Sequence, residues 1–164
     1  MKIKKKVYWV IGLFSLPLLW NLLRPGFYTS HDGEWMVIRL TAFHQELRSG
    51  QFPVRWLSRL NHSYGYPVTN FLYPLSFYLA EPFYILTKNP AFAIKSILVL
   101  SILSAAIGQW VLLKKFGNIA ALSGTLAYIY SPYFAYNIYQ RGSVGETLAM
   151  SIVPWLFWTI SKKR

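Results

Sequence analysis

Three stretches of this sequence are apolar and long enough to cross a lipid bilayer, and they constrain the fold more than any other feature. They cover residues 7–23, 91–113 and 118–138. A hydrocarbon core of ~30 Å needs about 20 mainly apolar residues in a helix, and irregular backbone exposed to lipid would leave polar groups without partners. Charged residues form only 13% of the chain, about half the usual share in soluble domains. We therefore expect an all-α integral membrane protein.

The basic residues predict how the spans are oriented. A net charge of +12 would suit a nucleic-acid-binding protein. However, the lysines and arginines form short clusters on either side of apolar runs. This arrangement predicts that the partner is a lipid bilayer and not a nucleic acid. One cluster precedes residue 7, Lys114 and Lys115 separate the second and third spans, and residues 162–164 follow the last apolar run. The positive-inside rule then places both termini in the cytoplasm. Positions 21–25 lack the small residues of a signal-peptide cleavage site, so we expect the first span to be retained as an anchor.

The remaining segments are expected to lie outside the membrane or at its surface, apart from one short span. Residues 24–66 form a polar outer loop, in which apolar residues recur at helical spacing and predict an amphipathic helix over 33–49 on the membrane surface: Met36, Leu40, Phe43 and Leu47, opposite Glu34, Arg39, Glu46 and Arg48. Residues 67–87 are apolar but interrupted by three prolines, and we expect a juxtamembrane or re-entrant element. A second outer loop covers 139–146, and a fourth span covers 147–161. Lys95, near one end of the second span, is expected to extend toward the interface.

Several short motifs occur in an order that resembles a known superfamily. They are His-Asp-Gly-Glu-Trp (31 to 35), Ser-Gly-Gln-Phe-Pro-Val-Arg-Trp (49 to 56), Tyr-Gly-Tyr-Pro (64 to 67), Ser-Pro-Tyr (131 to 133) and Tyr-Gln-Arg-Gly-Ser-Val-Gly-Glu (139 to 146). Together with the span order, they resemble the N-terminal part of GT-C membrane glycosyltransferases, and more narrowly bacterial membrane proteins labelled as related to 6-pyruvoyl-tetrahydropterin synthase. Nothing in the sequence suggests pterin chemistry. Members of this group are longer, so the resemblance implies an N-terminal fragment of a bacterial cytoplasmic membrane protein.

The resemblance implies a reaction and a catalytic residue. GT-C enzymes transfer a sugar from a polyprenyl-phosphate donor at the outer membrane face, and an acidic residue in the first outer loop usually acts as the base. Asp32 matches that position. The alternative is structural: Asp32 directly precedes the amphipathic helix and has the side chain of a good N-cap, a role that is compatible with catalysis.

The other candidate residues also have structural alternatives. Glu146 is a second catalytic candidate that could position an acceptor or a divalent cation, but Ser143 to Glu146 also match a capping box that starts the last helix. Arg141 could bind a lipid phosphate or simply extend toward the membrane interface. Arg55 and Arg59 are candidates for phosphate binding, although such arginines more often attract anionic headgroups. His31 could orient Asp32 or simply be solvated.

The sequence leaves three functions open. The leading expectation is the GT-C-like glycosyltransferase, with the bilayer and a lipid-linked sugar donor as partners. The second is a non-catalytic membrane scaffold or assembly subunit, and the third is a transporter component, which is disfavoured because Lys95 is the one ionisable residue that comes close to lying within a span. No cofactor is indicated by a motif, and a divalent cation remains an open expectation. The chain contains no cysteine, and its histidines are scattered, so no metal motif is predicted.

Overall fold

The computed structural model describes the backbone of residues 5–162 and the side chains of residues 11–162. Lys2, Lys4, Lys163 and Arg164, which belong to the two terminal basic clusters, lie outside the described residues. Helices are the main regular elements of this part, and its β pairing is a single isolated bridge between Leu57 and Tyr66. The prediction of an all-helical chain is therefore confirmed for the described residues.

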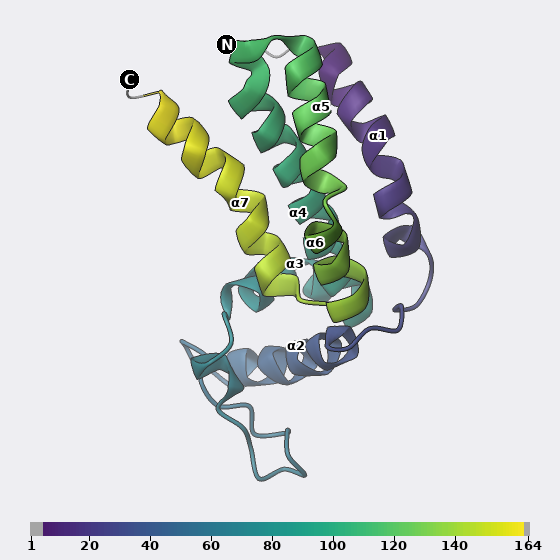
Figure 1. The fold of residues 1–164 in the computed structure, drawn as a ribbon. Coiled ribbons are helices and arrows are strands. Elements are labelled where there is room, and N and C mark those ends of the chain that lie inside the picture. The colour runs from purple at the N-terminus through teal and green to yellow at the C-terminus, as the bar shows by residue number, and fades with distance from the viewer. Residues whose placement is uncertain (1–4, 163–164) are drawn as a thin grey trace.

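Four helical rods form the upper part of the molecule in Figure 1. They are α1 (Lys5–Leu23), α4 (Pro90–Leu113), α5 (Asn118–Ile129) and α7 (Val144–Ser161). The start of α1, the η2 turn (Lys114–Phe116) and the end of α7 all lie toward one end of the molecule (Figure 1). The lysines of the turn and Lys162 are thus placed toward the same end.

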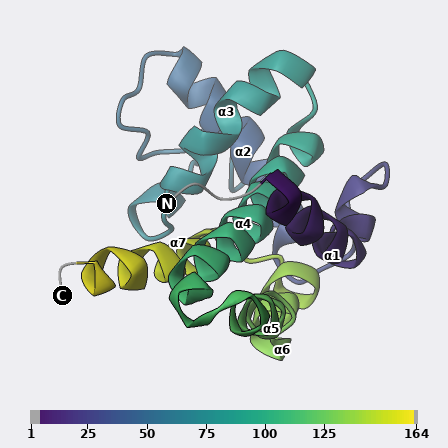
Figure 2. The ribbon, with the colours of Figure 1, turned by 90° about the horizontal axis from the view of Figure 1, so that it is seen from above.

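The opposite end carries the polar segment 24–66 and the apolar, proline-rich segment that follows it. Helix α2 (Gly33–Arg48) lies across this end, followed by a long loop, the short 3-10 helix η1 (Val68–Asn70) and α3 (Leu75–Thr87) (Figures 1 and 2). The prediction of an amphipathic helix over 33–49 is confirmed, because α2 buries Met36, Leu40 and Phe43. Residues 75–87 form a helix of 13 residues, about 20 Å long at 1.5 Å per residue and shorter than a bilayer core.

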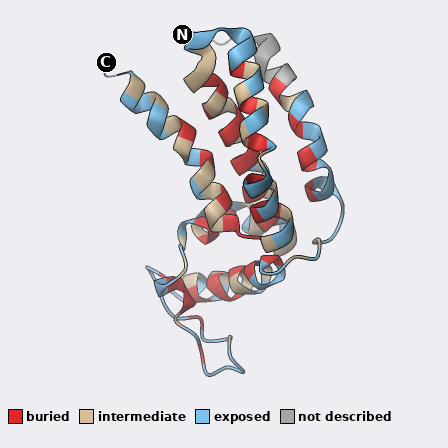
Figure 3. Cartoon of the chain, viewed as in Figure 1, coloured by how far each residue is buried: buried red, intermediate tan, exposed pale blue. Residues whose placement is uncertain are grey.

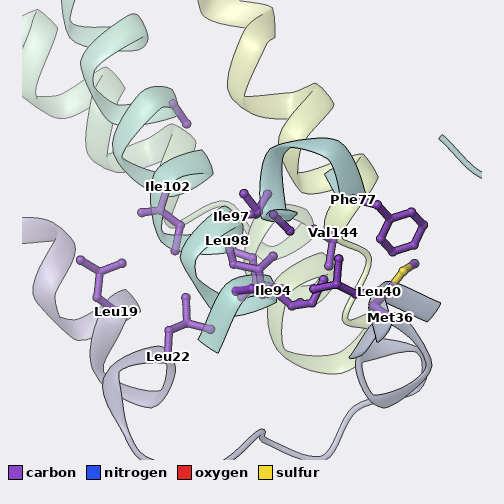
Figure 4. Packing of buried hydrophobic residues seen from close by; sticks show 14 of the residues in the cluster. Leu19, Leu22, Met36, Leu40, Phe77, Ile94, Ile97, Leu98, Ile102 and Val144 are labelled. Carbon is purple, nitrogen blue, oxygen red and sulfur yellow. The ribbon is translucent and has the colours of Figure 1, made fainter. Parts of the chain in front are cut away.

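Helix α4 is the central element of the fold. It contacts α1, α2, α3, α5 and α7, and buried residues run along its whole length (Figure 3). Asn89 caps its start by accepting a hydrogen bond from the Phe92 N–H at 3.0 Å, and Pro90 occupies the first turn, where the missing proline N–H has no cost. Figure 4 shows side chains from four other helices around it, and the labelled members are Leu19, Leu22, Met36, Leu40, Phe77, Ile94, Ile97, Leu98, Ile102 and Val144.

Among the described residues, one helix is long and apolar enough to cross a membrane by length and composition. It covers Pro90–Phe116 and agrees with the expected span over 91–113. The segment Ile11–Leu23 is a shorter apolar helix.

The expected third span over 118–138 is not one continuous helix. Helix α5 ends at Ile129, and a separate helix α6 (Pro132–Tyr136) and a π-helical segment η3 (Asn137–Arg141) follow it. The cause is Pro132, which disfavours helical backbone at the preceding residue, and Ser131 is extended with ψ 139°. The last helix begins at Val144, directly after Ser143, and so includes the last residues of the segment expected as an outer loop.

One charged side chain differs from expectation. Glu46, placed by helical spacing on the solvated face, is 8% exposed. Its carboxylate accepts hydrogen bonds from the Ser58 N–H at 3.0 Å and the Gln51 side chain at 3.3 Å, because the loop after α2 folds back over it.

Lys95 is 7% exposed. Its Nζ donates to the carbonyl of Arg24, the residue that follows α1, at 2.5 Å.

Candidate functional site

Two loops that are far apart in the sequence meet beside the N-terminus of α2. The His31 N–H donates to the Gln140 carbonyl and the Asp32 N–H donates to the Arg141 carbonyl, both at 2.8 Å. The N–H groups at the start of a helix and the carbonyls at the end of a helix have no hydrogen-bond partners within that helix. Here the end of η3 and the start of α2 satisfy each other. We call residues 30–33 and 140–142 the outer junction, after the two predicted outer loops to which they belong.

Two glycines allow the backbones of the outer junction to approach this closely. Gly142 has φ +67°, and a Cβ there would lie 2.5 Å from the Gly33 backbone nitrogen. A Cβ on Gly33 would lie 2.4 Å from both the Phe27 ring and the Ser30 hydroxyl. Real contacts of a Cβ with backbone atoms are longer than this, so the junction requires glycine at position 142 for both conformation and space.

Aromatic residues support the junction from one side. The Tyr28 hydroxyl donates to the Ile138 carbonyl at 2.5 Å, and its ring contacts that of Tyr139 with centroids 5.7 Å apart. Burial, with a smaller contribution from Tyr139, raises the pKa of Tyr28, and burial raises the pKa of Tyr139 to about 12. Both phenols therefore remain neutral near pH 7; Tyr28 acts through its hydrogen bond and packing, and Tyr139 acts through packing.

Asp32 stands at the position of the α2 N-cap, but its side chain makes no capping hydrogen bond. The Gly33 N–H bonds to the Ser30 hydroxyl instead, at 3.1 Å. Asp32 is exposed, and its carboxylate forms no ion pair with any described residue. The structural alternative that the sequence suggested for Asp32 is therefore not realised through its side chain, and the carboxylate is available to a ligand.

Arg141 and Glu146 form a bidentate ion pair next to the junction. Nη1 and Nη2 of Arg141 donate to the two carboxylate oxygens at 2.6 and 2.8 Å, and Nη1 also donates to the Asn137 amide oxygen at 2.9 Å. The hydrogen bonding that Arg141 donates to Glu146 is the largest cause of the raised pKa of Arg141. The side chains are 33% and 31% exposed, so a ligand can reach the pair.

The capping box expected around Glu146 does not form. Ser143 makes no side-chain capping bond, and its N–H donates to the Asn137 carbonyl at 2.9 Å. Glu146 is instead held by Arg141 and by the Tyr133 hydroxyl at 3.3 Å. The π-helical turn of η3 explains the difference, because it brings Arg141 and Asn137 alongside the first turn of α7.

The remaining candidates are spread over the same end of the molecule. His31 belongs to the outer junction and is exposed. Arg55 and Arg59 are exposed on the non-helical loop that follows the C-terminal end of α2. Asp32 is at the other end of that helix of 16 residues, about 24 Å away along its axis. The structure therefore brings Asp32, His31, Arg141 and Glu146 together and leaves both of these arginines apart.

A further polar pair was missed in the sequence. His44 on α2 and Glu81 on α3 share a hydrogen bond, with Nδ1 and Oε2 2.8 Å apart. Glu81 is 5% exposed, and its second oxygen has no partner among the described residues. The Tyr84 ring packs edge-on against His44. An acid inside an apolar, proline-rich stretch was the available signal, because such a residue rarely lies there without a partner.

No group of three or more histidine, cysteine, aspartate or glutamate side chains in the described part of the chain could hold a metal ion. In comparisons with known proteins, no family model, no curated protein and no solved structure matches this chain. The site is therefore interpreted from its own chemistry.

Proposed function

We propose that this protein takes part in sugar transfer from a polyprenyl-phosphate-type donor at the outer face of a membrane, as a GT-C-like glycosyltransferase. The observation that carries the proposal is the outer junction, which sets an exposed, unpaired carboxylate beside a reachable arginine. Both lie at the end of the molecule away from Lys114, Lys115 and Lys162 (Figure 1). The positive-inside rule puts those lysines in the cytoplasm and the junction outside.

In the proposed orientation, four helical segments cross the bilayer. They are α1, α4, α5 continued by α6, and α7. Helices α2 and α3 lie at the outer surface, where the buried faces of both contact α4. The break at Ser131 is tolerable because local hydrogen bonds satisfy the interrupted backbone. The Ser131 N–H donates to the Tyr128 carbonyl at 3.2 Å, and the Ser131 hydroxyl accepts from the Phe134 N–H at 3.4 Å.

The proposed reaction assigns a role to each group of the site. Asp32 accepts the proton of an acceptor hydroxyl while that oxygen forms a bond to the anomeric carbon of the sugar. The bond between this carbon and the phosphate oxygen breaks, and the lipid phosphate leaves with the electron pair. Arg141 offsets the charge on the phosphate. Glu146 and Asn137 accept hydrogen bonds from Arg141 and act as positioning residues, and the Tyr133 hydroxyl donates to Glu146.

The proposal is tested by a transfer assay with the protein expressed from its complete gene and reconstituted into proteoliposomes. The donors are polyprenyl monophosphate-linked hexoses and pentoses, each radiolabelled in the sugar, and a cell-envelope extract supplies acceptors. We expect label to move from the lipid fraction to an acceptor with at least one donor. Retention of all label on the lipid, with protein that is folded by circular dichroism, would contradict the proposal.

A second function is favoured by one observation. Arg141 and Glu146 satisfy each other's charge and hydrogen bonds. A purely structural ion pair in a non-catalytic scaffold would have the same geometry. A scaffold predicts that Asp32→Asn leaves cellular function unchanged and that Arg141→Gln impairs only assembly with partner proteins. The proposed enzyme predicts that both changes impair transfer.

A further inference from the structure

A cavity of about 400 Å³ lies between the end of α1 and the first turns of α4. Apolar side chains from α1, α3 and α4 form most of its wall: Leu22, Leu23, Phe83, Phe92, Val99 and Leu100. This volume is within the range of sites for small ligands. The cavity is separate from the outer junction, since none of the junction residues lines it.

The buried charge of Lys95 sets this cavity apart from an ordinary apolar groove. Lys95 lines the cavity and is 7% exposed, and its Nζ donates to the Arg24 carbonyl at 2.5 Å. No carboxylate of the described residues lies within ion-pair distance. A carbonyl at a helix end supplies only part of an elementary charge, and a buried ammonium group is costly without a full counter-charge. The cavity therefore favours an anion.

The surroundings indicate what kind of anion would bind. Arg24 also lines the cavity, its guanidinium lies 5.3 Å from the Trp20 ring centroid, and no acidic residue contributes to the wall. The apolar wall continues to the outer surface, where Leu23 is 63% exposed and Phe92 47% exposed. A free phosphate ion would leave this apolar surface uncovered, whereas a lipid would cover it with a chain.

We propose that the cavity binds one anionic phospholipid, with its phosphate between Lys95 and Arg24 and one acyl chain along the apolar wall. The inference rests on the membrane orientation given above and is independent of sugar transfer. Basic side chains at a membrane surface attract anionic headgroups, and burial of Lys95 increases the demand for a counter-charge. Bound lipid would join the end of α1 to the start of α4.

The test uses the purified full chain, delipidated in a neutral detergent, with native mass spectrometry and thermal unfolding as readouts. Dioleoyl phosphatidylglycerol is compared with dioleoylglycerol, which has the chains without phosphate, and with glycerol 3-phosphate, which has the phosphate without chains. We expect a single tightly bound phosphatidylglycerol and a higher unfolding temperature, with little effect of the other two. Equal stabilisation by glycerol 3-phosphate would show a free-phosphate site, and equal stabilisation by dioleoylglycerol a purely apolar one; either result overturns the proposal.

Three variants locate the binding site. Arg24 is exposed, so the Arg24→Gln variant should fold normally. We expect its affinity for phosphatidylglycerol to be about fivefold lower, which is the effect of one basic residue near a lipid surface. Lys95→Met keeps the length of the side chain and should reduce affinity at least as much. The control is Arg48→Gln, an exposed arginine in the last turn of α2, which should leave affinity unchanged. Equal losses in Arg24→Gln and Arg48→Gln would mean that the lipid responds to overall charge and would overturn the assignment.

Discussion

Replacement of Asp32 with asparagine is expected to reduce sugar transfer by about 10²- to 10⁴-fold, the usual contribution of a positioned general base. Asparagine has the same shape as aspartate but does not accept a proton from the attacking hydroxyl. The fold should be retained, because the Asp32 side chain is exposed and makes no capping bond. Initial rates with labelled donor lipid, measured together with thermal unfolding, check both expectations.

The matched control for this experiment is Glu34→Gln. Glu34 is also an exposed acid in the first turn of α2, so its replacement removes the same charge from the same helix end. We expect its transfer rate to stay within about twofold of the native rate, because electrostatic effects of one exposed charge on a helix end are small. Full activity in Asp32→Asn, or an equal loss in Glu34→Gln, would contradict the role of Asp32 as a base.

Replacement of Gly142 with alanine is expected to open the outer junction and abolish transfer. The positive φ alone costs alanine about 1–2 kcal/mol. In addition, the new methyl group would lie 2.5 Å from the Gly33 backbone nitrogen, which belongs to the rigid first turn of α2 and cannot turn aside like a side chain. Separation of the loops would break both bonds to His31 and Asp32.

Gly26→Ala is the control for this variant. Gly26 has φ +76° and no atom within 4 Å of an added Cβ. Alanine at this position therefore has the cost of a positive φ but makes no steric clash. We expect a small fall in unfolding temperature and retained transfer for Gly26→Ala, and a larger fall with loss of transfer for Gly142→Ala. If the two variants behave alike, the close approach at position 142 has no importance for the site.

Local patterns in the sequence were sufficient to predict several elements. Helix α2 follows from apolar residues at helical spacing, and α4 follows from a long apolar run that begins at an asparagine and a proline. Both signals come from residues that are close together in the sequence. The end of α5 was also encoded locally, by Pro132, but the apolar run that continues beyond it suggested one longer helix.

The geometry of the site depends on contacts that no local pattern contains. Asp32 and Arg141 were each candidates, but only the fold shows that their backbones are hydrogen-bonded. The π-helical turn places Arg141 next to Glu146, so Glu146 pairs with Arg141 instead of forming the expected capping box. Glu46 is buried by the loop that follows α2, so helical spacing alone assigned Glu46 to the wrong face. His44 pairs with Glu81, which is 37 residues further along the chain.

The most direct test of the account is the membrane orientation of the outer junction. Because the chain contains no cysteine, single cysteines can be placed at three exposed positions, Thr29, Asn118 and Gln140, and labelled in intact cells with a membrane-impermeant maleimide. We predict that Thr29→Cys and Gln140→Cys react from outside, and that Asn118→Cys reacts only after the membrane is permeabilised. Labelling of Asn118→Cys from outside with protection of Gln140→Cys would mean that residues 67–87 cross the membrane, and it would contradict the outer site.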